Sequence, residues 1–149
     1  MEAKPGSESK MQKFDICVKG IPSLPEGTHG MVQVVELPPG DPGPEPHRHS
    51  GPLFGYMLEG EMLFELEGGK PYAIKAGEGF WEPADVVHYR ASNLRDDITS
   101  RFVVFMLCAP GVPMTTFLDE AEIAERSQFR YPNVEIEEYS RRMPPVPSS

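Results

Sequence analysis

The sequence has few of the residues and segments that mark several large classes of protein. Only Cys17 and Cys108 are cysteines among 149 residues, which is too few and too widely spaced for a disulfide framework or a cysteine-rich zinc site, although a single bridge between them stays open. No apolar stretch is long enough to span a bilayer, and residues 1–13 contain no hydrophobic segment of a signal peptide. We therefore expect a cytoplasmic protein without membrane contact.

Positive charge is also scarce. The chain has 14 Lys and Arg residues against 23 Asp and Glu, for a net charge of -9 and a pI near 4.9. Binding to phosphate backbones needs clustered basic side chains, so nucleic acid is excluded as a partner. The length suits a single domain with a real hydrophobic core.

Helical patterns are nearly absent, whereas 17 prolines and 14 glycines divide the chain into short segments. Alternating or β-branched runs between these turns predict strands at 14–18, 31–37, 53–58, 61–66, 72–74, 80–82, 86–90 and 101–108. One helix is expected at 116–126, capped by Thr116. Such regular short strands predict an all-β fold, an antiparallel sandwich or barrel.

These patterns divide the chain into three parts. We expect a flexible arm over 1–13, a β-barrel over 14–112, and a helix with a proline-rich tail over 113–149. The strand at 101–108 is apolar on both faces, so something must cover its outer face.

Histidines are rare, yet two of the four lie together in Pro46-His47-Arg48-His49. Side chains two apart on an extended segment point to the same side. A third histidine, His88, follows about forty residues later and could complete a three-nitrogen site for a first-row transition metal with open positions. The proline-rich run 37–46 cannot be helix or central strand, and it would present the pair from a stiff loop.

Around this pair the sequence resembles the first motif of the cupin superfamily. That motif reads Gly, five residues, His-x-His, three or four residues, Glu, six residues, Gly. Here His47, His49 and Gly60 match, while the first glycine is displaced by one place, at Gly40.

The second cupin motif reads Gly, five residues, Pro-x-Gly, two residues, His, three residues, Asn. Gly77, Pro83 and His88 match it, Asp85 stands where glycine is usual, and Asn93 comes one residue late. The resemblance covers about residues 31–108. It implies an antiparallel double-stranded β-helix, or jelly-roll barrel, with a site inside the barrel.

One departure concerns the expected glutamate ligand, because Leu53 stands four residues after His49. If the extended chain continues from the histidines, Leu53, Gly55 and Met57 all face inward. Three alternatives follow. Three histidines alone hold the metal, as the resemblance allows for cupins such as the thiol dioxygenases; or the carboxylate has moved to another strand; or metal binding has been lost.

Glu82 is the best candidate for a displaced carboxylate, as a ligand or a general base, because it ends a strand just before the second motif's turn. On that strand either Phe80 and Glu82 or Gly79 and Trp81 face inward. Arg90, two residues after His88, is a candidate for holding a substrate carboxylate, with an exposed or ion-paired position as the alternative.

Other residues carry weaker expectations. The candidates for a small-molecule pocket wall are aromatic and thioether side chains, and most of them are expected to be plain core: Tyr56, Met57, Met62, Phe64, Trp81 and Met106. Tyr56 is also counted among the candidate catalytic residues. His29 is expected on the surface rather than as a fourth ligand, and Cys108 is expected to pack in the core.

The first hypothesis is therefore a cupin enzyme with a divalent transition metal (Fe, Mn, Ni or Zn) at His47, His49 and His88. The resemblance implies dioxygenation, isomerisation or decarboxylation of a small organic molecule. The alternative is a non-catalytic barrel that binds or senses a small molecule without metal. A homodimer is expected from the doubly apolar strand and from the way cupin barrels pack through a sheet.

Overall fold

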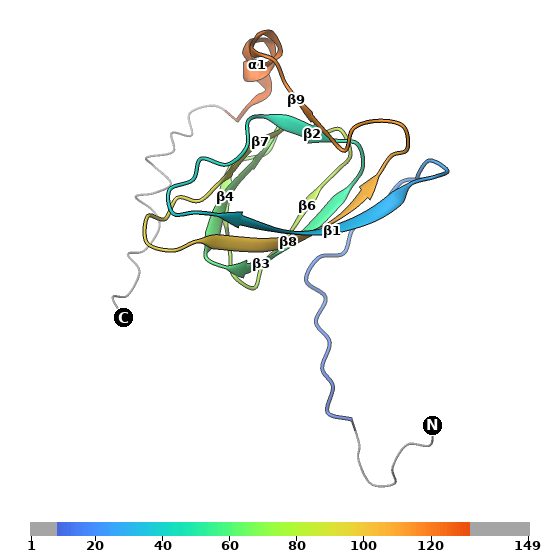
Figure 1. Ribbon diagram of the computed structural model, residues 1–149, viewed down its shortest axis with the longest axis vertical. Coiled ribbons are helices and arrows are strands. Elements are labelled where there is room, and N and C mark those ends of the chain that lie inside the picture. The colour runs from blue at the N-terminus through green and yellow to red at the C-terminus, as the bar shows by residue number, and fades with distance from the viewer. Residues whose placement is uncertain (1–8, 132–149) are drawn as a thin grey trace.

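The chain forms two antiparallel sheets that face each other, as the computed structural model, which describes residues 9–131, shows (Figure 1). The first sheet has the order β1 (His29–Leu37), β8 (Ser100–Cys108), β3 (Leu53–Glu59) and β6 (Gly79–Glu82). The second has the order β5 (Tyr72–Lys75), β4 (Glu61–Leu66), β7 (His88–Ser92), β2 (His47–His49) and β9 (Thr115–Phe117). The predicted all-β jelly-roll architecture is confirmed. The described part of the chain contains no helix long and apolar enough to cross a membrane.

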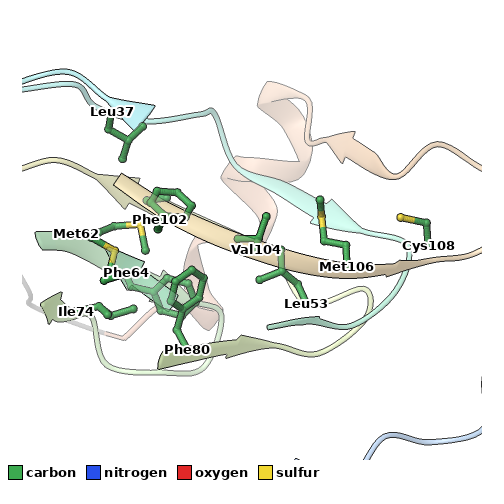
Figure 2. Packing of buried hydrophobic residues seen from close by; sticks show 12 residues of the cluster. Leu37, Leu53, Met62, Phe64, Ile74, Phe80, Phe102, Val104, Met106 and Cys108 are labelled. Carbon is green, nitrogen blue, oxygen red and sulfur yellow. The ribbon is translucent and has the colours of Figure 1, made fainter. Parts of the chain in front are cut away.

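The core lies between the sheets because alternate residues of each strand turn inward. On β8, Phe102, Val104 and Met106 are buried, as are Leu53 and Met57 on β3. Figure 2 shows Phe102 beside Met62 and Phe64 of the second sheet, which belong to the same core cluster. Gly55 also faces inward, where an added Cβ would lie 2.0 Å from the Phe80 ring, so only glycine allows this close packing.

Two predicted elements are corrected. Residues 14–18 form no strand; the segment lies against the outer face of the first sheet, where Ile16 and Cys17 contact Gly79. Cys17 is half-buried and Cys108 is buried, as expected of the latter, and both thiols are free.

The predicted helix at 116–126 begins four residues late. Thr115–Phe117 forms β9 instead, because its β-branched residues pair with the available edge of β2. The helix α1 (Glu120–Arg126) is capped by Asp119, whose side chain accepts from the Glu122 N–H at 2.8 Å. A short 3-10 turn, Ser127–Phe129, follows. The proline-rich end of the predicted tail lies outside the described residues.

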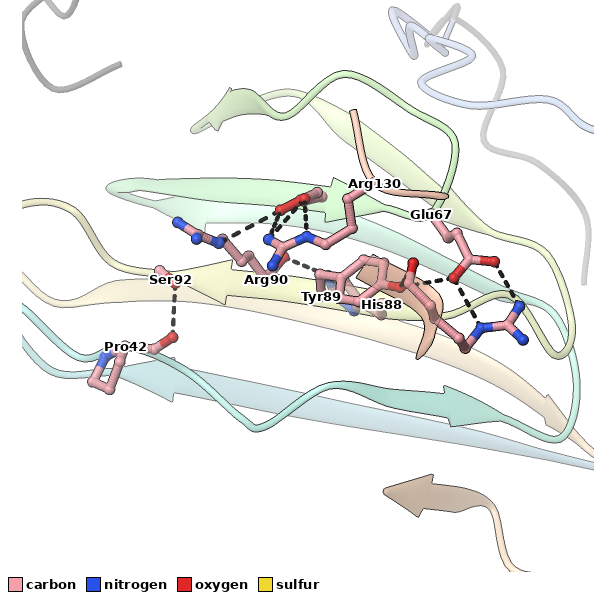
Figure 3. Close-up of polar contacts among 9 residues, drawn as sticks. Pro42, Glu67, His88, Tyr89, Arg90, Ser92 and Arg130 are labelled. Carbon is pink, nitrogen blue, oxygen red and sulfur yellow. Dashed lines mark hydrogen bonds and ion pairs between the residues drawn. The ribbon is translucent and has the colours of Figure 1, made fainter. Parts of the chain in front are cut away.

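Ion pairs fasten the helix region to the outside of the second sheet (Figure 3). Glu67 accepts from Arg126 Nε at 3.0 Å and from the Tyr89 hydroxyl at 2.7 Å. Burial and the Glu67 carboxylate raise the pKa of Tyr89 to about 12, which keeps its hydroxyl protonated and donating. Arg130 pairs with Glu65, which lies on β4. The chain after β9 is therefore held beside the barrel.

Candidate metal centre

A cavity of about 150 Å³ opens between the two sheets. Its lining comes from both sheets and from the loops before β2 and β9: Gln33, Val35, Leu37, Pro44, His47, His49, Leu53, Met62, Phe80, Glu82, His88, Ala91, Phe102, Val104, Met106, Met114 and Thr115. Gln33 and Pro44 are exposed, whereas most of the others are buried. The mouth of the cavity therefore lies between β1 and the loop that precedes β2.

The three predicted histidines are brought together by strand pairing in the second sheet. His47 on β2 is the cross-strand partner of His88 on β7, and their ring centroids are 5.1 Å apart. His49 lies on the same side of β2 as His47, at 4.9 Å between ring centroids. Both rings line the cavity, as the two-residue spacing predicts.

Glu82 supplies the carboxylate from the opposite sheet. Phe80 and Glu82 are the inward residues of β6, each 3% exposed, which decides between the two orientations left open by the sequence. Glu82 is also the cross-strand partner of Leu53, the residue at the position of the usual cupin glutamate. The carboxylate therefore enters nearly the same space from the adjacent strand.

Three donor atoms, one each from His47, His49 and Glu82, lie within 4.8 Å of one another and could hold a metal ion. His88, the third predicted ligand, is outside this set but adjoins it: its Nδ1 lies 3.0 Å from Glu82 Oε1. The Oε1 atom is also 4.0 Å from His49 Nε2. Glu82 therefore lies next to the rings of both His49 and His88.

Backbone carbonyls orient two of the rings. A carbonyl oxygen only accepts, so His47 Nδ1 donates to Glu45 O at 2.7 Å and leaves Nε2 with a free lone pair. In the same way His88 Nε2 donates to Arg90 O at 2.6 Å, which leaves Nδ1 free and facing Glu82. Such hydrogen bonds behind a ligand fix the tautomer that a metal requires.

The protonation of the cluster also suits a cation. Burial lowers the pKa of His47 and of His49, and in each case this outweighs the opposing influences of nearby groups. Burial alone would raise the pKa of Glu82, but the neighbouring histidines, His88 foremost, hold it below its usual range. His47 and His49 therefore favour the neutral imidazole and Glu82 favours the ionised carboxylate, which are the forms that bind metal.

A β-bulge in β7 decides between the two positions that the sequence left open for Arg90. His88 pairs with Leu66 and Arg90 pairs with Glu65, so two steps along β7 match one along β4 and Tyr89 is the extra residue. The bulge reverses the alternation. Arg90 consequently turns outward, where its Nε lies 3.5 Å from Glu65 Oε1, and Ala91 takes the inward place.

The same bulge accounts for one departure from the second cupin motif. The inserted residue lies between His88 and Asn93, which is why the asparagine comes one place late. The other departure, Asp85, adopts φ 64°, the left-handed conformation that favours the glycine usual there. Both departures therefore preserve the local backbone of the motif.

Tyr56, the third candidate catalytic residue, does not reach the cavity. It lies on β3 between the inward residues Gly55 and Met57, and it lines a shallow depression on the outer face of the first sheet. Among the other candidates, Met62 and Met106 do line the cavity. His29 is exposed at the start of β1, as expected of a surface residue.

Thr115 is a site residue that the sequence analysis missed. Its hydroxyl lies 3.1 Å from His49 Nδ1, so it can accept from that nitrogen and leave Nε2 free toward Glu82. The β-branched pair Thr115-Thr116 was a usable indication of a strand, but the acidic residues after it favoured a helix cap.

Comparison with known families agrees with this architecture. The family model described as "Cupin domain" matches residues 33–106, which contain both histidine motifs and Glu82. The chain belongs to the cupin superfamily. No curated protein matches it.

Several solved structures are similar to the chain. An uncharacterized conserved protein with a double-stranded β-helix domain from Klebsiella pneumoniae is 22% identical, with a TM-score of 0.50 over 76% of this chain and 100% of that one. An RmlC-like cupin from Shewanella frigidimarina is 22% identical, with a TM-score of 0.47 over 55% and 68%. The DMSP lyase DddQ from Ruegeria pomeroyi is 20% identical, with a TM-score of 0.51 over 59% of this chain and only 42% of the lyase. At these identities the likeness concerns the fold.

Proposed function

We propose that this protein is a metal-dependent enzyme that acts on a small organic molecule inside the barrel. A divalent transition ion, such as iron, manganese, nickel or zinc, would be held by His47, His49 and Glu82, with His88 joining through Nδ1. The observation that supports this most strongly is the position of a carboxylate and three imidazoles at one end of an apolar cavity with a mouth to solvent.

The arrangement of His88 and Glu82 fits a cation. Nδ1 of His88 is buried, carries a lone pair once Nε2 donates to Arg90 O, and has no hydrogen-bond partner among residues 9–131. A lone pair facing a carboxylate oxygen at 3.0 Å is repulsive unless a proton or a metal ion lies between them. Two ligands of one ion are about 3 Å apart when bonds of about 2.1 Å meet at right angles.

The bound ion would act as a Lewis acid on a substrate oxygen or sulfur, or would bind dioxygen, and so support the isomerase, decarboxylase or dioxygenase chemistry that the family resemblance suggests. The protein's own residues would do the rest. Glu45 O and Thr115 hold the two β2 imidazoles in place. Apolar side chains from β3, β6 and β8 exclude water from the reacting molecule.

Water exchange at the metal separates this enzyme from the non-catalytic alternative. Protein loaded with Mn²⁺ should speed the relaxation of bulk water protons, because an open catalytic site keeps an exchangeable position whereas a closed structural site does not. His47→Ala should lose this effect together with the bound Mn²⁺. A wild-type protein that binds Mn²⁺ without accelerating relaxation, or that binds none after supplementation, would favour the alternative, a barrel that binds or senses a small molecule without catalysis.

We also propose a homodimer through the outer face of the first sheet. Val32 and Val34 on β1 and Phe105 on β8 point away from the cavity and are 65%, 54% and 43% exposed. Adjacent exposed apolar side chains of this kind mark interaction surfaces. Light scattering at micromolar concentration should give twice the monomer mass, and Val34→Glu should shift it to the monomer. A monomeric wild type would contradict the proposal.

A further inference from the structure

The cavity sets the size and charge of the molecule that the site takes. We propose that the substrate is a compact apolar molecule, no larger than a small benzene derivative, with a single acidic donor group such as a phenol, thiol or enol. This inference rests on the proposed metal site and adds to it the class of substrate.

The upper limit on the size of the substrate follows from the volume of the cavity. The cavity measures about 150 Å³, which is close to an apolar cavity of about 150 Å³ known to accept benzene in another protein. The walls are fixed by buried strand residues, among them Leu53 at 3% exposed and Val104 at 4%, so the volume cannot grow without disturbing the packed core. Nucleotides and oligosaccharides are too large to be enclosed in it.

The limit on the charge of the substrate follows from the residues that line the cavity. Eleven of these seventeen residues offer only apolar side chains, and in the part of the chain that the structure describes, 9–131, none is lysine or arginine. Arg90, the one candidate for pairing with a substrate carboxylate, is turned outward by the bulge and paired with Glu65. A second anionic group on the substrate would thus be buried without a counter-charge, which is costly.

The metal end of the cavity accepts one negative charge. A divalent ion bound to neutral imidazoles and the Glu82 carboxylate leaves a net charge of about +1, which a single anionic donor neutralises. Gln33 at the mouth and Thr115 behind His49 are the remaining polar lining residues within the described range. The rest of the substrate should therefore be apolar.

Three probes test the donor and the apolar body separately. Titration calorimetry of the metal-loaded protein should show phenol binding at least about tenfold more tightly than oxalate, a dianion without an apolar body, and than benzene, which has no donor. Removing the metal should reduce phenol binding to the level of benzene. Oxalate binding as tightly as phenol would overturn the inference.

Neighbouring residues on β1 offer a matched pair of variants. Val35 lines the cavity and is half-buried, whereas Val34 points outward. Val35→Phe should weaken phenol binding at least about tenfold with the metal content unchanged, and Val34→Phe should leave both unchanged. Equal phenol binding by Val35→Phe and wild type would overturn the inference.

Failure of the proposed metal binding can be told apart from failure of the proposed apolar cavity. Protein that takes up no metal would contradict the proposed function, yet benzene should still bind the metal-free cavity and be excluded by Val35→Phe. Metal-free wild type that binds no benzene would contradict the apolar cavity itself.

Discussion

Glu82→Leu is expected to lower metal affinity at least about a hundredfold, because loss of a mere supporting partner of a ligand already costs about 10- to 100-fold. The double variant Leu53→Glu/Glu82→Leu should recover most of this affinity. Leu53 and Glu82 are cross-strand partners on β3 and β6, and both line the cavity, so the exchange returns a carboxylate to the same space. Titration with Co²⁺, followed by its absorption spectrum, measures both effects.

Thermal melting of the metal-free proteins supplies the control for this pair. Glu82 is 3% exposed, and burying an ionised carboxylate without a bound cation is costly, so leucine removes this cost from the metal-free protein. Glu82→Leu should therefore keep or raise its melting temperature while losing metal. If Glu82→Leu binds metal as tightly as the wild type, Glu82 is not a ligand. If the double variant binds metal as weakly as Glu82→Leu, a carboxylate at residue 53 does not reach the same space as one at residue 82.

Asn93→Asp is expected to destabilise the fold by about 3 kcal/mol or more, because it removes a buried donor and adds a charge. Asn93 is 2% exposed, and its Nδ2 donates to the carbonyls of Leu37, Pro38 and Ile98 at 3.1, 3.0 and 2.8 Å. The single side chain thus joins the end of β1 to the turn before β8. A carboxylate there would face three carbonyl oxygens.

Urea denaturation measures the effect, with Ser92→Ala as the matched control. Ser92 is adjacent and donates one hydrogen bond, to Pro42 O at 2.7 Å near solvent, so its loss should cost about 1 kcal/mol or less. Equal stability of the two variants would contradict the role assigned to Asn93.

Much of the site could be predicted from local alternation. The spacing of His47 and His49, and the parity that continues to Leu53 and Met57, hold because no bulge interrupts these inward positions. Glu82 was identified as a candidate from its place at a strand end just before the second motif's turn, and alternation on that strand left only two orientations to decide between.

The errors arise where distant segments decide local structure. Alternation allowed Arg90 to share the inward face of His88, but the bulge at Tyr89 depends on pairing with β4, and its one mark in the sequence is the late position of Asn93. Thr115–Phe117 forms a strand because the edge of β2 is available to it. Neither pairing can be read from the local sequence alone. The outward position of Arg90 therefore stayed one of two alternatives, and the role of Thr115 was missed.

The metal content of the full-length protein tests the central claim most directly. Protein expressed without a histidine tag and purified without chelator should contain about one transition-metal ion per chain by elemental analysis, and His47→Ala should contain far less. Wild type and His47→Ala that are equally free of metal, before and after metal supplementation, would contradict the account.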